Sequence, residues 1–154
     1  MKRLKIGDLL EIKTNKGYFY AQYTHQVESY GTLVRVFNNS CPSRPDNIAE
    51  ILNGDIRLTT FFPLRSAIKR GDVVVVGNYP VRSDLVELPI FRIRGVNFVN
   101  PKAAIWFLWD GVNKVKVDQL SDEQKGYPIA SVLTYELFIH RLETGWTLRE
   151  DGLS

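Results

Sequence analysis

Residues 6–22 (IGDLLEIKTNKGYFYAQ) constrain the fold more than any other stretch of this chain. Leu10 and Ile12 point one way while their neighbours point the other, which is the period of two expected of a half-buried strand. Gly17 follows where a short hairpin loop requires a positive φ, so the segment predicts a β-hairpin. The returning strand, YFYAQYTH, carries apolar bulk on both faces. Such a strand either lies between two packed layers or presents its tyrosine face to a partner.

Six further segments have strand patterns, at residues 32–38, 55–61, 72–77, 90–94, 104–109 and 112–117. The run DVVVVG at 72–77 is typical of a strand buried on both faces, and AIWFLW at 104–109 of a central strand. In the IFRIR segment, Arg92 and Arg94 are expected on the outer face. The eight segments predict an α+β fold, mainly β, with a strongly bent antiparallel sheet or a small open barrel. No repeat or linker divides the chain, so we expect a single domain over residues 1–154.

One long helix is expected at residues 131–144 (SVLTYELFIHRLET), packed on the sheet. Val132, Tyr135 and Ile139 recur at helical spacing and form its apolar stripe. Gly145 lies where a left-handed C-cap belongs.

A loop rich in proline and polar residues occupies residues 38–47 (NNSCPSRPDN). It is longer than the usual connection, and loops of this kind are either functional or simple surface excursions. The residues that follow, 48–52, favour a short helical turn that Gly54 ends in a left-handed conformation.

The composition is that of a globular cytoplasmic protein. The chain has 154 residues, 44% hydrophobic and 24% charged, which suits one domain of ordinary size. Cys41 is the single cysteine, which excludes an internal disulfide and fits a reducing compartment. Gly7 and Asp8 interrupt any apolar run near the N-terminus, so no signal peptide is expected. The longest apolar run, 103–109, is far shorter than the ~20 residues of a spanning helix, so we expect no membrane association.

The sequence holds no pattern typical of catalysis, metal binding or cofactor binding. A zinc site needs about four Cys, His or carboxylate ligands at close spacing, whereas this chain has one Cys and two His, far apart. Cys41 with His25 or His140 could be imagined as a nucleophilic pair, but no local signature supports it. No phosphate-cradling glycine loop occurs. We therefore expect a protein that is not an enzyme, with no catalytic residue, no cofactor and no metal.

The number of aromatic residues, 8 Phe, 7 Tyr and 3 Trp, is the remaining indication of function. A core of this size uses most of the Phe and Trp, while Tyr and Arg dominate the hot spots of protein interfaces. The candidate partner-binding residues are the tyrosines around the first hairpin and the arginine of the proline loop: Tyr18, Tyr20, Tyr23, Tyr30 and Arg44. The alternative, in which these tyrosines only pack the sheet, fits the sequence equally well.

Five segments together give the chain a resemblance to a known family. They are KIGDLLEIKTNKGYFYAQYTH, GTLVRVF, GDVVVVGNYPV, WFLWDG and ELFIHRLETGW. Their glycine turns, aromatic strand and capped helix resemble the immunity protein 26 family of bacterial polymorphic-toxin systems, over nearly the whole chain. The resemblance implies a small cytoplasmic protein that binds and neutralises a cognate toxin protein without catalysis or cofactor. It carries over no set of functional residues and no oligomeric state.

The charge balance bears on the partner. Formal net charge is +3 and the sequence pI is near 9.0. Antidotes to basic nuclease toxins tend to be acidic, so a mildly basic chain argues against a nuclease partner or confines acidic contacts to a local patch. The alternative function is a small β-barrel nucleic-acid-binding module, suggested by the pI and by Arg92 and Arg94. No run of three basic residues occurs and the charges are scattered, which argues against nucleic acid.

Overall fold

Eight strands and two α-helices make up the computed structural model, which describes residues 3–146. The strands are β1 (Asp8–Thr14), β2 (Gly17–Val27), β3 (Gly31–Phe37), β4 (Ile56–Phe61), β5 (Val73–Asn78), β6 (Phe91–Gly95), β7 (Ile105–Trp109) and β8 (Lys114–Val117). The helices are α1 (Leu64–Arg70) and α2 (Tyr135–Thr144), and the 3₁₀ turns are η1 (Ile48–Asn53), η2 (Ser83–Leu85) and η3 (Gln124–Gly126). All eight expected strands are confirmed.

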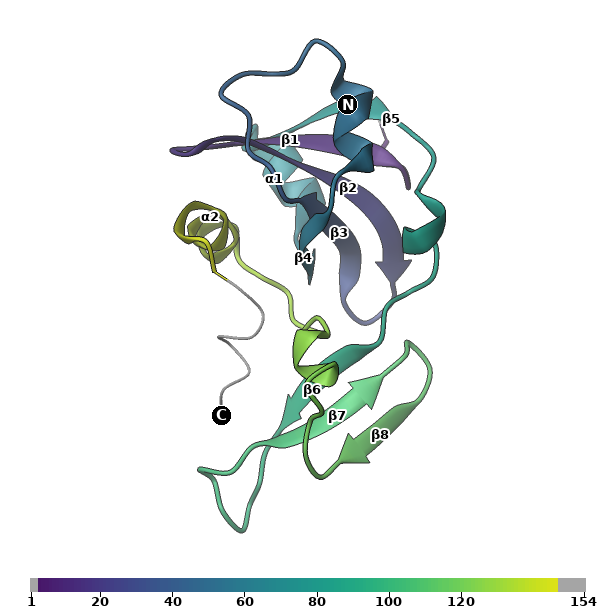
Figure 1. The fold of residues 1–154 in the computed structure, drawn as a ribbon, viewed down its shortest axis with the longest axis vertical. Helices are drawn as coiled ribbons and strands as arrows, with labels where there is room; N and C mark the ends of the chain where they lie inside the picture. Colours follow the sequence, from purple (N-terminus) through teal and green to yellow (C-terminus); the bar gives the residue numbers. More distant parts are fainter. Residues whose placement is uncertain (1–2, 147–154) are drawn as a thin grey trace.

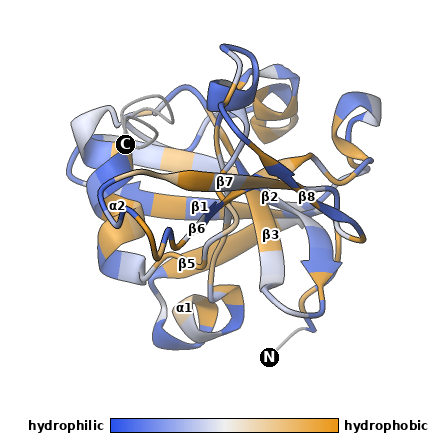
Figure 2. Cartoon of the chain, turned by 90° about the horizontal axis from the view of Figure 1, so that it is seen from below, coloured by the Kyte–Doolittle hydropathy of each residue, from blue (hydrophilic) through white to orange (hydrophobic). Residues whose placement is uncertain are grey.

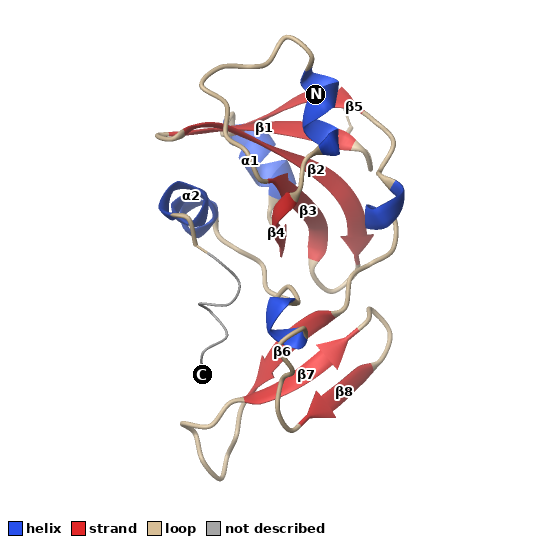
Figure 3. Cartoon of the chain, viewed as in Figure 1, coloured by secondary structure: helices blue, strands red, loops and turns tan. Residues whose placement is uncertain are grey.

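The strands form two antiparallel sheets (Figures 1 and 3). The larger sheet has the order β4-β3-β2-β1-β5 and the smaller one β6-β7-β8. The predicted α+β, mainly β class is therefore confirmed, with two sheets in place of one, and neither described sheet closes into a barrel. No helix in the described part of the chain is long and apolar enough to cross a membrane.

The β1–β2 hairpin forms as its sequence predicts. Thr14 pairs with Gly17 across a two-residue loop, and Gly17 has a φ of 104°. The proline loop packs against this end of the hairpin, where Tyr18 and Cys41 exchange backbone hydrogen bonds of 2.7 and 2.8 Å. A Cβ on Gly17 would lie 2.7 Å from the carbonyl oxygen of Cys41. The glycine is thus required both by the turn and by the close approach of the loop.

Strand β2 lies between two packed layers. On one face, Phe19 and Ala21 belong to a core cluster that also contains Ala67 of α1 and Phe138 of α2. On the other face, Tyr20 packs with Leu9, Phe37 and the partly buried residues of η1. The first of the two arrangements expected for this strand is therefore the one that forms.

The smaller sheet joins the larger one through a third apolar cluster, built on Leu33, Phe61 and Phe91. Its aromatic rings form a continuous stack, with centroids 4.8 Å apart for Tyr30 and Phe61 and 5.2 Å apart for Phe61 and Phe91. Trp109 of β7 completes the cluster at 5.2 Å from the Tyr30 ring. Figure 1 shows the smaller sheet below the larger one.

Helix α2 begins at Tyr135, four residues later than the predicted start. Thr134 has extended backbone angles, and its side chain accepts a hydrogen bond from the Leu137 N–H, which fixes the N-cap. The preceding residues are extended because Val132 forms a parallel bridge to Phe61 of β4. Val132 is consequently half exposed instead of lying in the apolar stripe. The predicted left-handed cap at Gly145 is confirmed, with a φ of 70°.

Three local expectations were wrong, each for a tertiary reason. Gly54 ends η1 with extended angles (φ −76°, ψ 165°), because β4 begins immediately after it. Strand β5 is an edge strand, so Val74 and Val75 are 47% and 39% exposed instead of buried on both faces. Arg92 is fully buried: its Nε donates to the Tyr127 carbonyl, and its guanidinium lies 5.2 Å from the Trp106 ring centroid.

We predict that Gly17→Ala destabilises the protein more than Gly31→Ala. Both glycines have a positive φ, so each substitution introduces backbone strain of about 1–3 kcal/mol. Only at Gly17 does the new Cβ also meet the backbone of Cys41, since Gly31 has open space around it. Urea unfolding of the two variants measures the difference. Equal losses of stability in the two variants would show that the proline loop can move away from the hairpin without lowering the free energy of unfolding.

Candidate functional site

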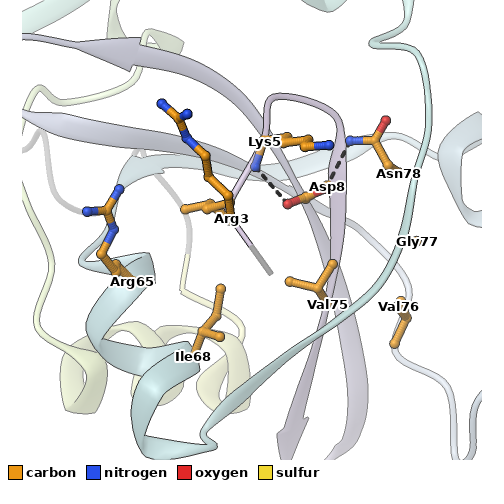
Figure 4. Close-up of a pocket in the computed structure, with 10 residues that line it drawn as sticks. Arg3, Lys5, Asp8, Arg65, Ile68, Val75, Val76, Gly77 and Asn78 are labelled. Carbon is orange, nitrogen blue, oxygen red and sulfur yellow. Dashed lines mark hydrogen bonds between the residues drawn. The ribbon is translucent and has the colours of Figure 1, made fainter. Parts of the chain in front are cut away.

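A cationic cleft of about 1060 Å³ lies between the N-terminal segment, α1 and β5 (Figure 4). Arg3 and Lys5 come from the segment before β1, and Arg65 comes from the exposed side of α1. Ile68 and Val75 form an apolar wall between the helix and the strand. Helix α1 is held in place by Leu64 and Ala67, which are buried in the core beneath it.

The positive charges of the cleft are not neutralised from within the described structure. Arg3, Lys5 and Arg65 are exposed, and none of them forms an ion pair with a described residue. Asp8 is the one acidic residue of the lining, and its carboxylate accepts hydrogen bonds of 2.9 Å from the Lys5 N–H and from Asn78 Nδ2. Three cations against one engaged carboxylate make this cleft suited to an anionic ligand or an acidic surface.

Strand β5 gives the cleft an unpaired edge. In the described residues β5 pairs with β1 alone, so the main-chain groups on its outer side have no strand partner. Figure 2 shows β5 as a hydrophobic strand, and its exposed valines are the apolar part of this edge. An exposed edge with apolar side chains is a surface to which an extended segment of another protein can add.

Two of the five candidate residues meet at Glu11, on the opposite face of the sheet from α1 and α2. The Tyr20 hydroxyl donates to Glu11 Oε2 at 2.8 Å. Arg44 donates through Nε and Nη2 to both Glu11 oxygens, at 2.8 and 3.0 Å. Arg44 thereby ties the proline loop to β1. Tyr20 itself is fully buried, so it contributes to this cluster from beneath and offers no surface of its own.

This arrangement shifts the acidity of both partners of the hydrogen bond. The Arg44 guanidinium, with help from the Tyr20 hydroxyl, holds the pKa of Glu11 below its ordinary value of 4.5, against the opposing effect of burial. Burial, and then the hydrogen bond to Glu11, raises the pKa of Tyr20. Glu11 is therefore ionised and Tyr20 protonated at neutral pH.

Tyr18 lies beside this cluster, because it packs in the same apolar cluster as Tyr20 and helps to raise the pKa of Arg44, after Glu11 itself. Tyr23 and Tyr30 lie elsewhere. Tyr18 is half buried at the end of the hairpin, and Tyr30 is part of the aromatic stack between the sheets. Tyr23 is buried on the helix side, where Arg65 and Asp8 of the cationic cleft both influence its pKa, which burial raises. The fold thus brings Tyr18, Tyr20 and Arg44 together and places Tyr23 and Tyr30 apart from them. Whether any of the five contacts a partner stays a prediction.

Sequence reasoning missed Glu11 and the cations of the cleft. Glu11 could have been found, because the hairpin register sets it directly opposite Tyr20. Arg3 and Lys5 belong to the densest basic stretch of the chain, Lys-Arg-Leu-Lys. That signal is weak because the leucine interrupts the run. Arg65 gave no signal, since only the packing of α1 beside β1 and β5 brings it to the same cleft.

Cys41 and His25, one of the two pairs considered for catalysis, are separated by the fold. Cys41 pairs with Tyr18 at one end of β2, and His25 lies seven residues further along the strand, a separation of roughly 20 Å. His25 is engaged elsewhere, with Nε2 2.7 Å from the Val86 carbonyl oxygen. No group of three or more His, Cys, Asp or Glu in the described chain is placed to hold a metal ion.

Comparison with known proteins gives no relative for this chain: no family model, no curated protein and no solved structure matches it.

We predict that Tyr20→Phe lowers the free energy of unfolding by about 1.5–3 kcal/mol, the range for a hydrogen bond to a charged group. The matched control is Tyr23→Phe, which removes a hydroxyl that donates to the neutral Gln26 Oε1 and should lower it by about 0.5–1.5 kcal/mol. Urea unfolding near pH 7 measures both. Equal effects would contradict the coupling of Tyr20 to an ionised Glu11.

The same pair of variants has a distinct pH dependence. Because the pKa of Glu11 is lower in the folded than in the unfolded chain, its contribution to stability is present above the unfolded value and is lost as pH falls through the folded one. Tyr20→Phe removes the tyrosine hydrogen bond, which is one of the causes of the lowered pKa of Glu11. The variant should therefore lose less stability than the wild type when urea unfolding is repeated below pH 4.5, whereas Tyr23→Phe should follow the wild type.

Proposed function

We propose that this protein is a non-catalytic immunity protein, which binds a cognate bacterial toxin domain in the cytoplasm and neutralises it by occupying its surface. The observation that carries the proposal is the cationic cleft: Arg3, Lys5 and Arg65 are exposed beside the apolar edge of β5, and none of them forms an ion pair with a described residue. The resemblance of the sequence to the immunity protein 26 family supports the toxin as the class of partner.

The cleft sets the chemistry expected of the partner. Exposed cations accelerate association with an acidic surface and disfavour basic partners. The toxin domain should therefore present Asp or Glu side chains at its contact surface, and this suits a toxin other than a basic nuclease. The edge of β5 adds a main-chain component, because an extended segment of the partner can hydrogen-bond to it while apolar side chains contact Val74 and Val75.

The cleft is part of a larger contact. A stable protein interface involves about 20–30 residues on each side, more than the cleft provides. The adjoining exposed apolar residue Ile6 and the outer edge of β5 extend the surface in two directions. Exposed Phe98 and Val99, in the loop between β6 and β7, form a second apolar surface on the smaller sheet.

We predict that Arg65→Glu weakens binding to the toxin domain encoded beside this gene about tenfold or more, equivalent to ~1.4 kcal/mol. The matched control is Lys116→Glu, which makes the same change of charge at an exposed position of β8 in the smaller sheet. Calorimetry of the purified pair and growth rescue on co-expression measure the effect. A complex that survives Arg65→Glu and is lost with Lys116→Glu would move the interface to the smaller sheet.

A nucleic-acid-binding module is the alternative function, and the same three exposed cations favour it. Of the two arginines that suggested it, Arg92 is buried and only Arg94 is exposed. Binding carried by phosphate contacts falls steeply as salt is added. We expect no binding of a mixed-sequence oligonucleotide even at low salt in a fluorescence-anisotropy titration. Salt-sensitive binding that is weakened by Arg65→Glu would instead establish the alternative.

A further inference from the structure

A second hollow, of about 480 Å³, lies on the face of the larger sheet that faces away from α1 and α2. Its floor is formed by β3 and β4, and its walls by the segment around η2 and by residues 126–128. Arg35 of β3 points into this face, because its neighbours Val34 and Val36 both belong to the core cluster under the helices. The hollow lies between the two apolar clusters of that face, one at Tyr20 and one at Phe61.

Arg35 is the unusual residue of this hollow. It is only 6% exposed, and its Nε is buried without a hydrogen-bond partner. No ion pair with a described residue involves it either. Its strand neighbours do not supply a counter-charge, since Gln22 of β2 and Thr59 of β4 lie beside it in the register. A buried guanidinium is ordinarily paired or fully hydrogen-bonded.

Asp84, Arg82 and Arg57, three of the charged residues around the hollow, are already engaged. Asp84 is an acidic group that acts on Arg35, but its two oxygens accept from Arg82 at 2.6 and 3.1 Å. Arg82 is fixed in turn by the carbonyls of Leu52 and Gly54, at 2.8 and 2.7 Å. Arg57 lines the hollow through β4, yet its guanidinium is turned to the helix face, where it donates to the Arg141 carbonyl.

The isolation of Arg35 has an electrostatic consequence. Burial lowers its pKa to about 10, and Asp84 opposes this only in part. The side chain is still protonated at neutral pH. The folded protein therefore keeps a positive charge in a place where solvation is poor and the Nε–H has no acceptor, which is unfavourable for folding.

We propose that the hollow above Arg35 binds a single carboxylate group of a ligand outside this chain. A carboxylate offers two coplanar oxygens that match the fork of a guanidinium, and it would give the buried Nε–H its missing acceptor. Asp55 and Asp84 also line the hollow, and they disfavour a multiply charged group such as phosphate. Leu85, Pro89 and Pro128 provide apolar contacts for the carbon atoms that carry the carboxylate.

The carboxylate has two possible sources, with the same chemistry. It can be a free small molecule, or it can be an Asp or Glu side chain of the partner protein. The second source rests on the proposed function, and the first does not. The experiment therefore has one arm that uses the protein alone and one that uses the complex.

In the first arm, sodium acetate is titrated into ¹⁵N-labelled protein at constant ionic strength, with sodium chloride as the balancing salt. We expect a saturable shift of the Arg35 Nε–Hε resonance, half-complete at millimolar acetate, and a much smaller response to inorganic phosphate. The matched control variant is Arg94→Met, which removes an exposed arginine and should leave the titration unchanged. A linear, unsaturated response of the Arg35 resonance would overturn the proposal.

Arg35→Met supplies a second readout in the same arm. The variant replaces an unpaired buried charge by an apolar side chain of similar length, so it should fold and keep or exceed the melting temperature of the wild type. It should also abolish the rise in melting temperature that acetate gives the wild type. A clear fall in melting temperature without acetate would show that the guanidinium has a structural role, and would overturn the proposal.

In the second arm, the affinity of Arg35→Met for the toxin domain is compared with that of the wild type and of Arg94→Met. A loss of tenfold or more, confined to Arg35→Met, assigns the carboxylate to the partner. Unchanged affinity together with saturable acetate binding assigns it to a free small molecule. If no toxin complex forms with any variant, the proposed function fails while the acetate arm still decides the site.

Discussion

The burial of both faces of β2 is the constraint on which the rest of this structure depends. A central strand with two packed faces needs a layer on each side, and its polar groups must all find partners within the protein. The helix layer takes up Phe19 and Ala21. The other face contains Gln22, which is 1% exposed and donates through Nε2 to the carbonyls of Gly7 and Tyr79, at 3.2 and 3.0 Å.

The hydrogen bonds of β2 also fix the chain segment that leads into the cationic cleft. Gly7 is held by β2 from two directions, since its N–H donates to the Tyr23 carbonyl at 2.8 Å and its own carbonyl accepts from Gln22. Its φ of 95° turns the chain sharply before β1 begins. The segment with Arg3 and Lys5 is thereby directed over the sheet toward α1. Two of the three exposed cations of the cleft therefore precede a turn that a buried glutamine helps to hold.

Local sequence patterns predicted most of the fold because they depend on contacts within one element. The glycine at the hairpin loop and the cap at Gly145 are short-range features, and both are present. The side chains of β1 alternate as expected, with Leu10 in the helix-side cluster and Leu9 in the opposite one, but the strand is buried on both faces and is not half-buried. The start of α2 was predicted too early, because the bridge between Val132 and Phe61 is a contact across the fold. The exposure of β5 was missed for the same reason: an apolar run does not reveal whether its strand is central or at an edge.

The candidate sites were harder to predict than the fold, and the reason is again distance along the chain. Arg44 and Tyr20 were identified by residue type, but the Glu11 that joins them follows only from the register. The cleft combines residues 3–5 with Arg65 and β5, and nothing in the sequence relates those segments. Arg35 looked like an ordinary polar residue of an alternating strand, since its missing partner is a property of the packed structure alone.

The two cationic sites differ in what positive charge does for the protein. Arg3, Lys5 and Arg65 are exposed, so their charge is well solvated, has little effect on folding, and is weakened by salt. Arg35 is desolvated, so its charge opposes folding and is hardly screened. The net charge of +3 does not distinguish these cases. An exposed cluster increases the rate at which an acidic partner associates, whereas a buried, unpaired guanidinium favours the one group that completes its hydrogen bonds. We therefore expect the cleft to speed the association of an acidic partner, and the hollow at Arg35 to select the chemical group that binds there.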